Sequence, residues 1–298
     1  MATEKPWSEI GAGPPGSADI NILGVPFDGA VSNAAGAAEA PVRLRELSKI
    51  LPPFSEAGVD LRPLRIHDYG DLPVTSEWEG YFDSVKEKAA GLFRSGGFNL
   101  FLGGDHSINI PLSAAFAEHH YPAPVGMIHL DSHCDLMDVY DGLKWSHACP
   151  QRRFLEQPNA EPKRLFLLGI RSYEAEELDF INRHPSLTVV GAGQFLQQTP
   201  GQTLQMICEA MSGLESLYLS LDIDVLDPAY APGTGTPEGG GLSTRQVFEL
   251  VRNIVERLPV KAMDLVEVAP PLDHSDITSW AALKIIYELF AALALKKQ

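Results

Sequence analysis

Short apolar runs alternate with longer amphipathic segments along most of the 298-residue chain. The short runs are continuously apolar, which is typical of parallel strands buried on both faces. The longer segments repeat apolar residues at helical spacing, as Val247, Leu250, Val251 and Ile254 do. This order predicts an α/β fold with one parallel sheet covered by helices on both faces. We expect strands at residues 20–25, 64–70, 98–104, 125–131, 164–170, 187–192, 217–224 and 260–268.

The chain shows no internal repeat and no low-complexity linker, so we expect one domain rather than two. Residues 1–19 are rich in Gly, Pro and Ser and predict an extended N-terminal arm. Residues 20–298 then form the single domain. We expect helices near residues 37–50, 79–95, 107–120, 174–184, 202–214, 243–257 and 276–296.

The composition narrows the class of protein. Hydrophobic residues make up 45% of the chain and charged residues 21%, an ordinary globular balance. The net charge of −16 disfavours binding to nucleic acid or anionic membranes. Three cysteines without a CxxC pair argue against a disulfide framework or a zinc ribbon. With no signal-peptide pattern and no long apolar stretch, we expect a cytoplasmic protein that binds neither nucleic acid nor membranes.

Polar residues follow the apolar strands at the points where the strands end. In open parallel sheets, ligands bind outside these carboxyl ends. One expected strand leads into Asp105 and His106, and the last contains Glu267. Two further strand ends add acidic residues and one more histidine. The candidate metal ligands are His106, Asp131, His133, Asp135, Asp222 and Asp224.

The spacing of these residues favours a pair of metal ions. Asp131, His133 and Asp135 are two residues apart, which would point them to one side of an extended chain. Four carboxylates so close would repel one another unless a cation lay between them. Six ligands suit two ions better than one, and mixed histidine and carboxylate ligands suit Mn²⁺, Fe²⁺, Ni²⁺, Co²⁺ or Zn²⁺ rather than Ca²⁺. Taken singly, each piece also fits a structural role, such as a helix cap at Asp222; their convergence favours the metal site.

The segment after Asp227, "PAYAPGTGTPEGGG", is dense in Gly and Pro. Glycine permits close backbone approach, and proline stiffens the path. We therefore expect a structured wall of the site rather than a flexible linker.

Four motifs resemble the ureohydrolase family, which contains arginases and agmatinases: "GGDHSI", "DSHCD", "SLDIDVLDPAYAPGTGTPEGGGLS" and "DLVEVAPPLDHSDIT". The last two look most like the agmatinase branch. The resemblance runs from residue 24 to the C-terminal helix. It implies a three-layer α/β/α arginase-like fold with a roughly eight-stranded parallel sheet. It also implies a trimer or hexamer that hydrolyses a guanidinium to urea and an amine. The implied cofactors are two divalent ions, Mn²⁺ in most members and Ni²⁺ or Zn²⁺ in some.

The resemblance also assigns roles to individual residues. One ion would be bound by His106, Asp131, Asp135 and Asp222, and the other by Asp131, His133, Asp222 and Asp224. Glu267 would pair with the substrate guanidinium, because a carboxylate matches its two parallel N–H groups. His147 would carry protons, since its ordinary pKa suits that role. Asp135 would accept a proton from the attacking water.

The chain departs from the agmatinase pattern around the expected substrate tail. Ala148 and Cys149 follow His147 where the pattern has Gly-Thr, and Ala34 stands where it has an arginine. Ser132 replaces an alanine between two ligands. Agmatine is the expected substrate; 4-guanidinobutanoate, 3-guanidinopropanoate, guanidine and alkylguanidines are the alternatives. A role for Cys149 stays open.

The loop at residues 136–145 is expected to contact the substrate tail. Asp138 and Asp141 suit a cationic tail, whereas the basic residues of the same region suit a carboxylate. Trp145 suits a small apolar pocket. The basic residues are Lys144, Arg152 and Arg153.

Two other classes of function compete with this one. Metal-dependent deacetylases have a similar fold but use one zinc ion and lack the second Asp-x-Asp pair with its Gly-Pro loop. The chain could also be a degenerate subunit that regulates an active homologue within a hetero-oligomer. The complete ligand set, together with His147 and Glu267, argues against that second reading.

Overall fold

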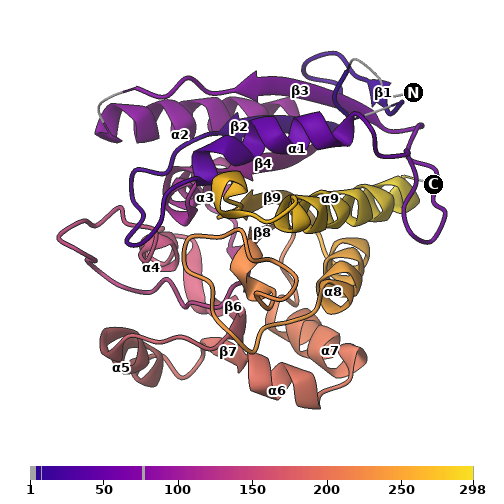
Figure 1. Ribbon diagram of the computed structural model, residues 1–298. Helices are drawn as coiled ribbons and strands as arrows, with labels where there is room; N and C mark the ends of the chain where they lie inside the picture. The colour runs from indigo at the N-terminus through magenta and orange to yellow at the C-terminus, as the bar shows by residue number, and fades with distance from the viewer. Residues whose placement is uncertain (1–4, 8, 76–77, 298) are drawn as a thin grey trace.

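The computed structural model describes residues 5–7, 9–75 and 78–297, and these form one sheet between two layers of helices (Figure 1). The sheet has nine strands in the order β1-β3-β2-β4-β9-β8-β5-β6-β7, and every ladder between neighbouring strands is parallel. The strands are β1 (Gly11–Ala12), β2 (Ile20–Val25), β3 (Arg65–Asp71), β4 (Phe98–Gly103), β5 (Val125–Leu130), β6 (Ala160–Ile170), β7 (Thr188–Gly191), β8 (Leu217–Asp222) and β9 (Val260–Val266).

Each face of the sheet is covered by its own helices. In Figure 1, α2 to α5 lie to the left of the sheet and α7 to α9 to the right. Two hydrophobic clusters fill the spaces between the layers, one on each face. The helices are α1 (Ala40–Ser48), α2 (Trp78–Ser95), α3 (Asn109–His120), α4 (Pro150–Phe154), α5 (Ala175–Arg183), α6 (Ala192–Gln197), α7 (Pro200–Ala210), α8 (Thr244–Arg257) and α9 (Ile277–Lys296).

The three-layer α/β/α prediction is confirmed, with local differences. All eight expected strands are present, and the ninth, β1, is a two-residue strand inside the expected N-terminal arm. β1 pairs with β3, and Trp7 packs edge-on against Phe290 of α9 at 5.9 Å. Part of the arm is therefore fixed to the sheet. β6 starts four residues earlier than expected, because its first four residues alternate between half-buried and exposed positions and so lack the continuous apolar run by which the strand was predicted.

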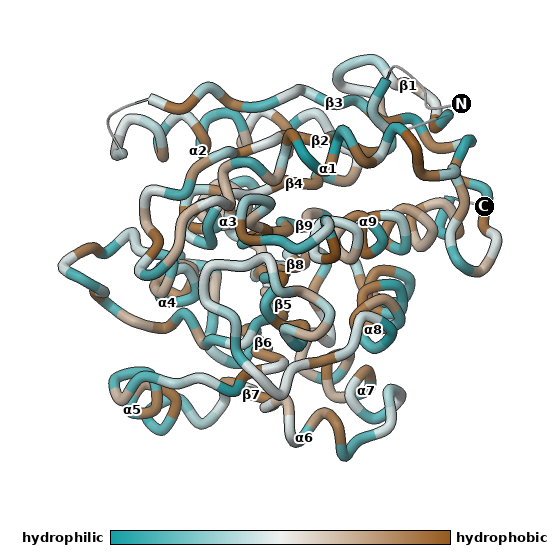
Figure 2. The backbone as a smooth tube through the Cα atoms, in the orientation of Figure 1, coloured by the Kyte–Doolittle hydropathy of each residue, from teal (hydrophilic) through white to brown (hydrophobic). Residues whose placement is uncertain are grey.

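Helix α9 is long and apolar enough to cross a membrane by length and composition. Its apolar residues are coloured brown in Figure 2, and 78% of its most apolar window is buried inside the protein. That burial is what a core helix of a globular domain shows.

The strand order explains where the site forms. β4, β9, β8 and β5 are consecutive neighbours in the middle of the sheet. Since all four run parallel, their carboxyl ends meet at one edge, and the polar residues that follow them are brought together.

Candidate metal centre

Each candidate ligand lies at the end of one of these strands or just beyond it. His106 follows β4 and begins a short 3-10 turn, whereas Asp222 ends β8. Asp224 lies in the next 3-10 turn, where its N–H donates to Oδ1 of Asp222 at 2.8 Å. The extended geometry expected for residues 131–135 is wrong: they form a turn, and Asp135 has a φ of 55°.

The ligands form two groups that share Asp131. In the first, Nδ1 of His106 lies 2.9 Å from Asp135, 3.0 Å from Asp131 and 3.2 Å from Asp222, all at Oδ2. In the second, Nδ1 of His133 lies 3.1 Å from Oδ2 of Asp224 and 3.5 Å from Oδ1 of Asp131. The structure thus brings all six predicted ligands together, and their division matches two adjacent cation sites.

The chemistry of the donor set fits metal ions. Four buried side-chain atoms in this cluster have no hydrogen-bond partner: Nδ1 of His106 and Oδ2 of Asp131, Asp135 and Asp224. Orphaned buried atoms are costly, and a cation would satisfy them together. Burial, followed by the charges of Asp224 and Asp131, raises the pKa of Asp222 well above its ordinary value. That repulsion disappears when positive charge lies between the carboxylates.

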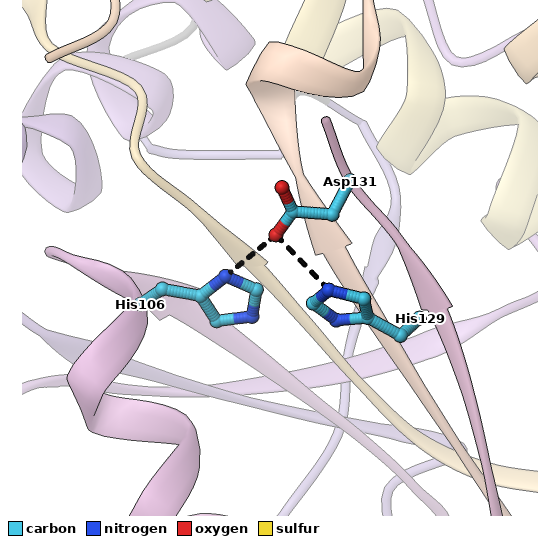
Figure 3. Close-up of side chains that lie close together, drawn as sticks. All are labelled: His106, His129 and Asp131. Atoms are coloured by element: carbon cyan, nitrogen blue, oxygen red, sulfur yellow. Dashed lines mark ion pairs between the residues drawn. The ribbon is translucent and has the colours of Figure 1, made fainter. Parts of the chain in front are cut away.

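A histidine that the sequence analysis did not single out lies in the same cluster. Figure 3 shows His129 and His106 both reaching Asp131. Nε2 of His129 is 3.2 Å from Oδ2 of Asp131 and 3.1 Å from the carbonyl of His133, and Gln151 contacts its Nδ1 at 3.0 Å. Its signal in the sequence is a lone histidine in a continuously apolar strand, two residues before a ligand. Through these contacts, His129 holds the carboxylate of Asp131 and the backbone of His133 in place.

Glu267 and His147 lie next to the ligand cluster. Glu267 follows β9 with a φ of 62°, an uncommon backbone conformation for this residue type. Its Oε1 accepts from the N–H of His106 at 2.8 Å and lies 3.5 Å from Nδ1 of His147. Burial by itself would lower the pKa of His147, but Glu267 raises it above its ordinary value. Burial and the nearby Glu267 raise the pKa of Asp105 to about 7.

A cavity of about 150 Å³ opens over the cluster. Its floor includes His106, His133, Asp135, His147 and Asp222. The rest of its lining comes from the loops around it, mainly Ser32, Met137, Tyr140, Tyr173, Glu174, Glu177 and Thr236. Among the described residues, no lysine or arginine lines this cavity.

The predicted tail-binding residues lie elsewhere. Asp138, Asp141 and Trp145 do not line this cavity. Asp138 is paired with Arg153, and Trp145 packs near Phe82 with 38% of its surface exposed. Cys149 is fully buried, and burial raises the pKa of its thiol to about 12, which leaves it without a thiolate at neutral pH.

The Gly-Pro loop after β8 is held in place by two side chains. Asp227 accepts hydrogen bonds from the N–H groups of Ala229, Gly240 and Gly241 at 2.8–3.1 Å. Arg171 donates to backbone carbonyls on both sides of the loop, including those of Asp224 and Glu238. The expected structured wall is what these bonds produce, and it carries Thr236 into the cavity.

A parallel sheet with clustered histidines and aspartates at its carboxyl edge is an arrangement that could hold metal ions. Comparison with known proteins makes this specific: a model of the arginase family matches residues 18–291. The chain belongs to the arginase family, whose members are hydrolases of guanidino carbon–nitrogen bonds and depend on a binuclear metal centre.

Relatives within the family differ in the substrate that they are named for. The mitochondrial guanidino acid hydrolase of Homo sapiens is 36% identical over 284 residues, covering 94% of this chain and 79% of that protein. The agmatinase of Bacillus anthracis is 34% identical over 276 residues, covering 91% and 90%. The solved structure of proclavaminate amidinohydrolase from Streptomyces clavuligerus superposes with a TM-score of 0.87 at 32% identity, covering 98% of both chains. These identities are so similar that they do not indicate which of these substrates this chain uses.

Proposed function

We propose that this protein hydrolyses agmatine to putrescine and urea with two divalent metal ions, and that these ions are Mn²⁺. The observation that carries the proposal is the cavity: the candidate metal ligands lie in its floor, and among the described residues of the surrounding loops Glu174 is the only Asp, Glu, Lys or Arg side chain in its lining. A guanidinium at the floor and an amine at the loops would match both ends.

The metal ions would be held by His106, Asp131, Asp135 and Asp222 on one side and by Asp131, His133, Asp222 and Asp224 on the other. When bound, such a pair activates water at neutral pH and stabilises charge that develops in the transition state. The buried orphan atoms described above support this ligand set. Ni²⁺ is the alternative metal, because it accepts the same ligands.

The chain's own side chains would orient the substrate and move protons. The carboxylate of Glu267 would pair with the planar guanidinium through two parallel hydrogen bonds. Asp135 would take the proton of the attacking water and pass it to the leaving amine. His147, held between Glu267 and Ser32, would carry to solvent a second proton, the one released when the next water molecule is activated.

The charges around the cavity favour an amine tail over a carboxylate tail. The two arginines that could receive a carboxylate are engaged elsewhere. The guanidinium of Arg152 stacks on Phe180 at 4.2 Å, and Arg153 pairs with Asp138 and Glu156. A guanidino acid would therefore bring its carboxylate toward Glu174 without a compensating cation, and like charges disfavour binding.

We also propose a cytoplasmic homo-oligomer, a trimer or hexamer. All three cysteines are free, as expected in a reducing compartment. Val139, Leu143 and Trp145 expose 38–43% of their surfaces on one loop, which supports burial against a second copy. Light scattering on the purified protein tests the mass, and co-purification of a homologue would instead indicate a hetero-oligomer with a regulatory subunit.

The test of function is urea release from three guanidines of similar length that differ only in the tail. Agmatine ends in an amine, 4-guanidinobutanoate in a carboxylate and butylguanidine in a methyl group. The protein is loaded separately with Mn²⁺ and Ni²⁺. We expect agmatine to have the highest kcat/KM, and Glu174→Gln to lower it for agmatine only. A preference for 4-guanidinobutanoate, or no urea from any compound with both ions bound, contradicts the proposal.

A further inference from the structure

A buried polar cluster lies behind the candidate metal centre, in the middle of the sheet. Asp264 of β9 and Ser220 of β8 are opposite one another in neighbouring strands, and both are fully buried. Tyr218 of β8 and Asn109 at the start of α3 complete the cluster. A buried carboxylate is expensive to keep in a core, so its presence needs a physical reason.

The carboxylate of Asp264 accepts three side-chain hydrogen bonds. Its Oδ2 accepts from Nδ2 of Asn109 at 2.7 Å and from the hydroxyl of Tyr218 at 3.0 Å. Its Oδ1 accepts from Oγ of Ser220 at 2.7 Å. Three donors thus compensate the buried charge, and the single proton of the Ser220 hydroxyl is committed to Asp264.

Because the hydroxyl of Ser220 donates to Asp264, its oxygen can only accept hydrogen bonds from its other neighbours. Oγ of Ser220 lies 2.8 Å from Nε2 of His106 and 3.3 Å from Nδ2 of Asn109. Because its own proton points to Asp264, Oγ accepts at both contacts, so Nε2 of His106 carries the hydrogen. The opposite nitrogen, Nδ1, is then the ring atom that is left to bind a metal ion, and it is the atom that faces Asp131, Asp135 and Asp222.

We propose that Ser220 and Asp264 are positioning residues that fix the tautomer and the orientation of His106, so that Nδ1 is presented to one of the two metal ions. The inference rests on the metal centre proposed above. Histidines that bind metals commonly donate their other N–H to a fixed acceptor, and loss of that acceptor weakens metal binding. Here the acceptor is the hydroxyl of Ser220, and the carboxylate of Asp264 holds that hydroxyl in place by accepting its hydrogen bond.

The experiment compares Ser220→Ala with Tyr218→Phe, a matched control on the same strand. Each variant removes one hydroxyl and one hydrogen bond to Asp264, but only Ser220→Ala removes the acceptor of His106. Metal content is measured by plasma mass spectrometry after titration with a chelator. We expect Ser220→Ala to bind one of its two ions about tenfold to a hundredfold more weakly, whereas Tyr218→Phe keeps both.

The result separates positioning from simple packing. Weaker binding of only one ion supports the proposal that Ser220 and Asp264 position His106, because His106 belongs to one group of ligands only. Equal affinities in the two variants, or parallel loss of both ions in Ser220→Ala, overturn the proposal. Thermal unfolding of the metal-free variants shows whether Ser220→Ala folds as well as Tyr218→Phe. Failure of the proposed function looks different: the wild type would bind two ions without releasing urea, and the comparison of affinities would stand.

Discussion

His147 faces Glu267 through Nδ1, which lies 3.5 Å from Oε1, while its Nε2 contacts Oγ of Ser32 at 2.9 Å. The imidazole is therefore held from both sides, by β9 and by the loop after β2. Glu267 also accepts from the N–H of His106, so one carboxylate connects the proposed proton carrier to the ligand cluster.

Glu267→Gln should separate substrate binding from metal binding. The amide keeps the shape of the side chain and an acceptor for His106, but it removes the charge that would pair with the guanidinium. We expect kcat/KM to fall by roughly a hundredfold, since loss of a buried charge partner costs a few kcal/mol. Because Glu267 raises the pKa of His147, the acidic limb of the pH–rate profile should move to lower pH. Urea release measured across pH checks both effects.

The control for this prediction is the metal content, which should stay at two ions in Glu267→Gln. Loss of an ion would mean that Glu267 acts by supporting His106 rather than by binding substrate.

Asp224→Ala should remove one metal ion together with activity. Asp224 faces only His133 among the histidines, with 3.1 Å between Oδ2 and Nδ1, so the other ligand group stays intact. We expect one ion instead of two by plasma mass spectrometry, and no urea. Asp60→Ala is the matched control, because Asp60 is exposed and pairs only with Arg62. Full activity with a single ion would contradict a two-ion mechanism.

The sequence predicted the layers and the ligand cluster because both follow from short-range patterns. Continuous apolar runs indicate buried parallel strands, and parallel strands bring their carboxyl ends to one edge. The chain order of Asp131, Asp222 and Glu267 relative to those runs was therefore enough to place them together. The backbone of residues 131–135 was harder to predict, because its turn depends on contacts with Gln151 and Glu177.

Other parts of the site depend on contacts between distant segments, which no local pattern reports. Ser220 and Asp264 lie in separate apolar runs far apart in the sequence, and only strand pairing makes them neighbours. Asp138 looked like a tail-binding acid from its position in the loop, but Arg153 neutralises it. Glu177 lies in the helix expected near residues 174–184, and the fold buries it at the cavity wall, which the helical pattern alone does not predict.

Asp227→Ala should loosen the Gly-Pro loop without removing a metal ligand. The carboxylate accepts three backbone N–H groups, and these bonds lower its pKa, most of all the bond from Ala229. We expect a loss of about 1–3 kcal/mol in the free energy of unfolding, since hydrogen bonds to a charged group are stronger than neutral ones. Asp227→Asn should lose less, because the amide keeps one acceptor. Denaturant unfolding measures both; equal stability of Asp227→Ala and wild type would show that Arg171 alone holds the loop.

The metal-free protein should lose stability as pH rises from about 4.5 to 7, and Glu177 should account for part of that loss. Burial raises the pKa of Glu177 to about 7, so in this window the folded state holds a proton that the unfolded state has released. Folding is then penalised increasingly with pH, by roughly 3 kcal/mol at most. Glu177→Gln has no such proton. It should be less stable than wild type at pH 4.5, because both oxygens of Glu177 accept backbone N–H groups, and the difference should shrink by pH 7. Chemical unfolding at several pH values checks this, with the exposed Glu161→Gln as control; curves for wild type and Glu177→Gln that stay parallel across the window would contradict the raised pKa.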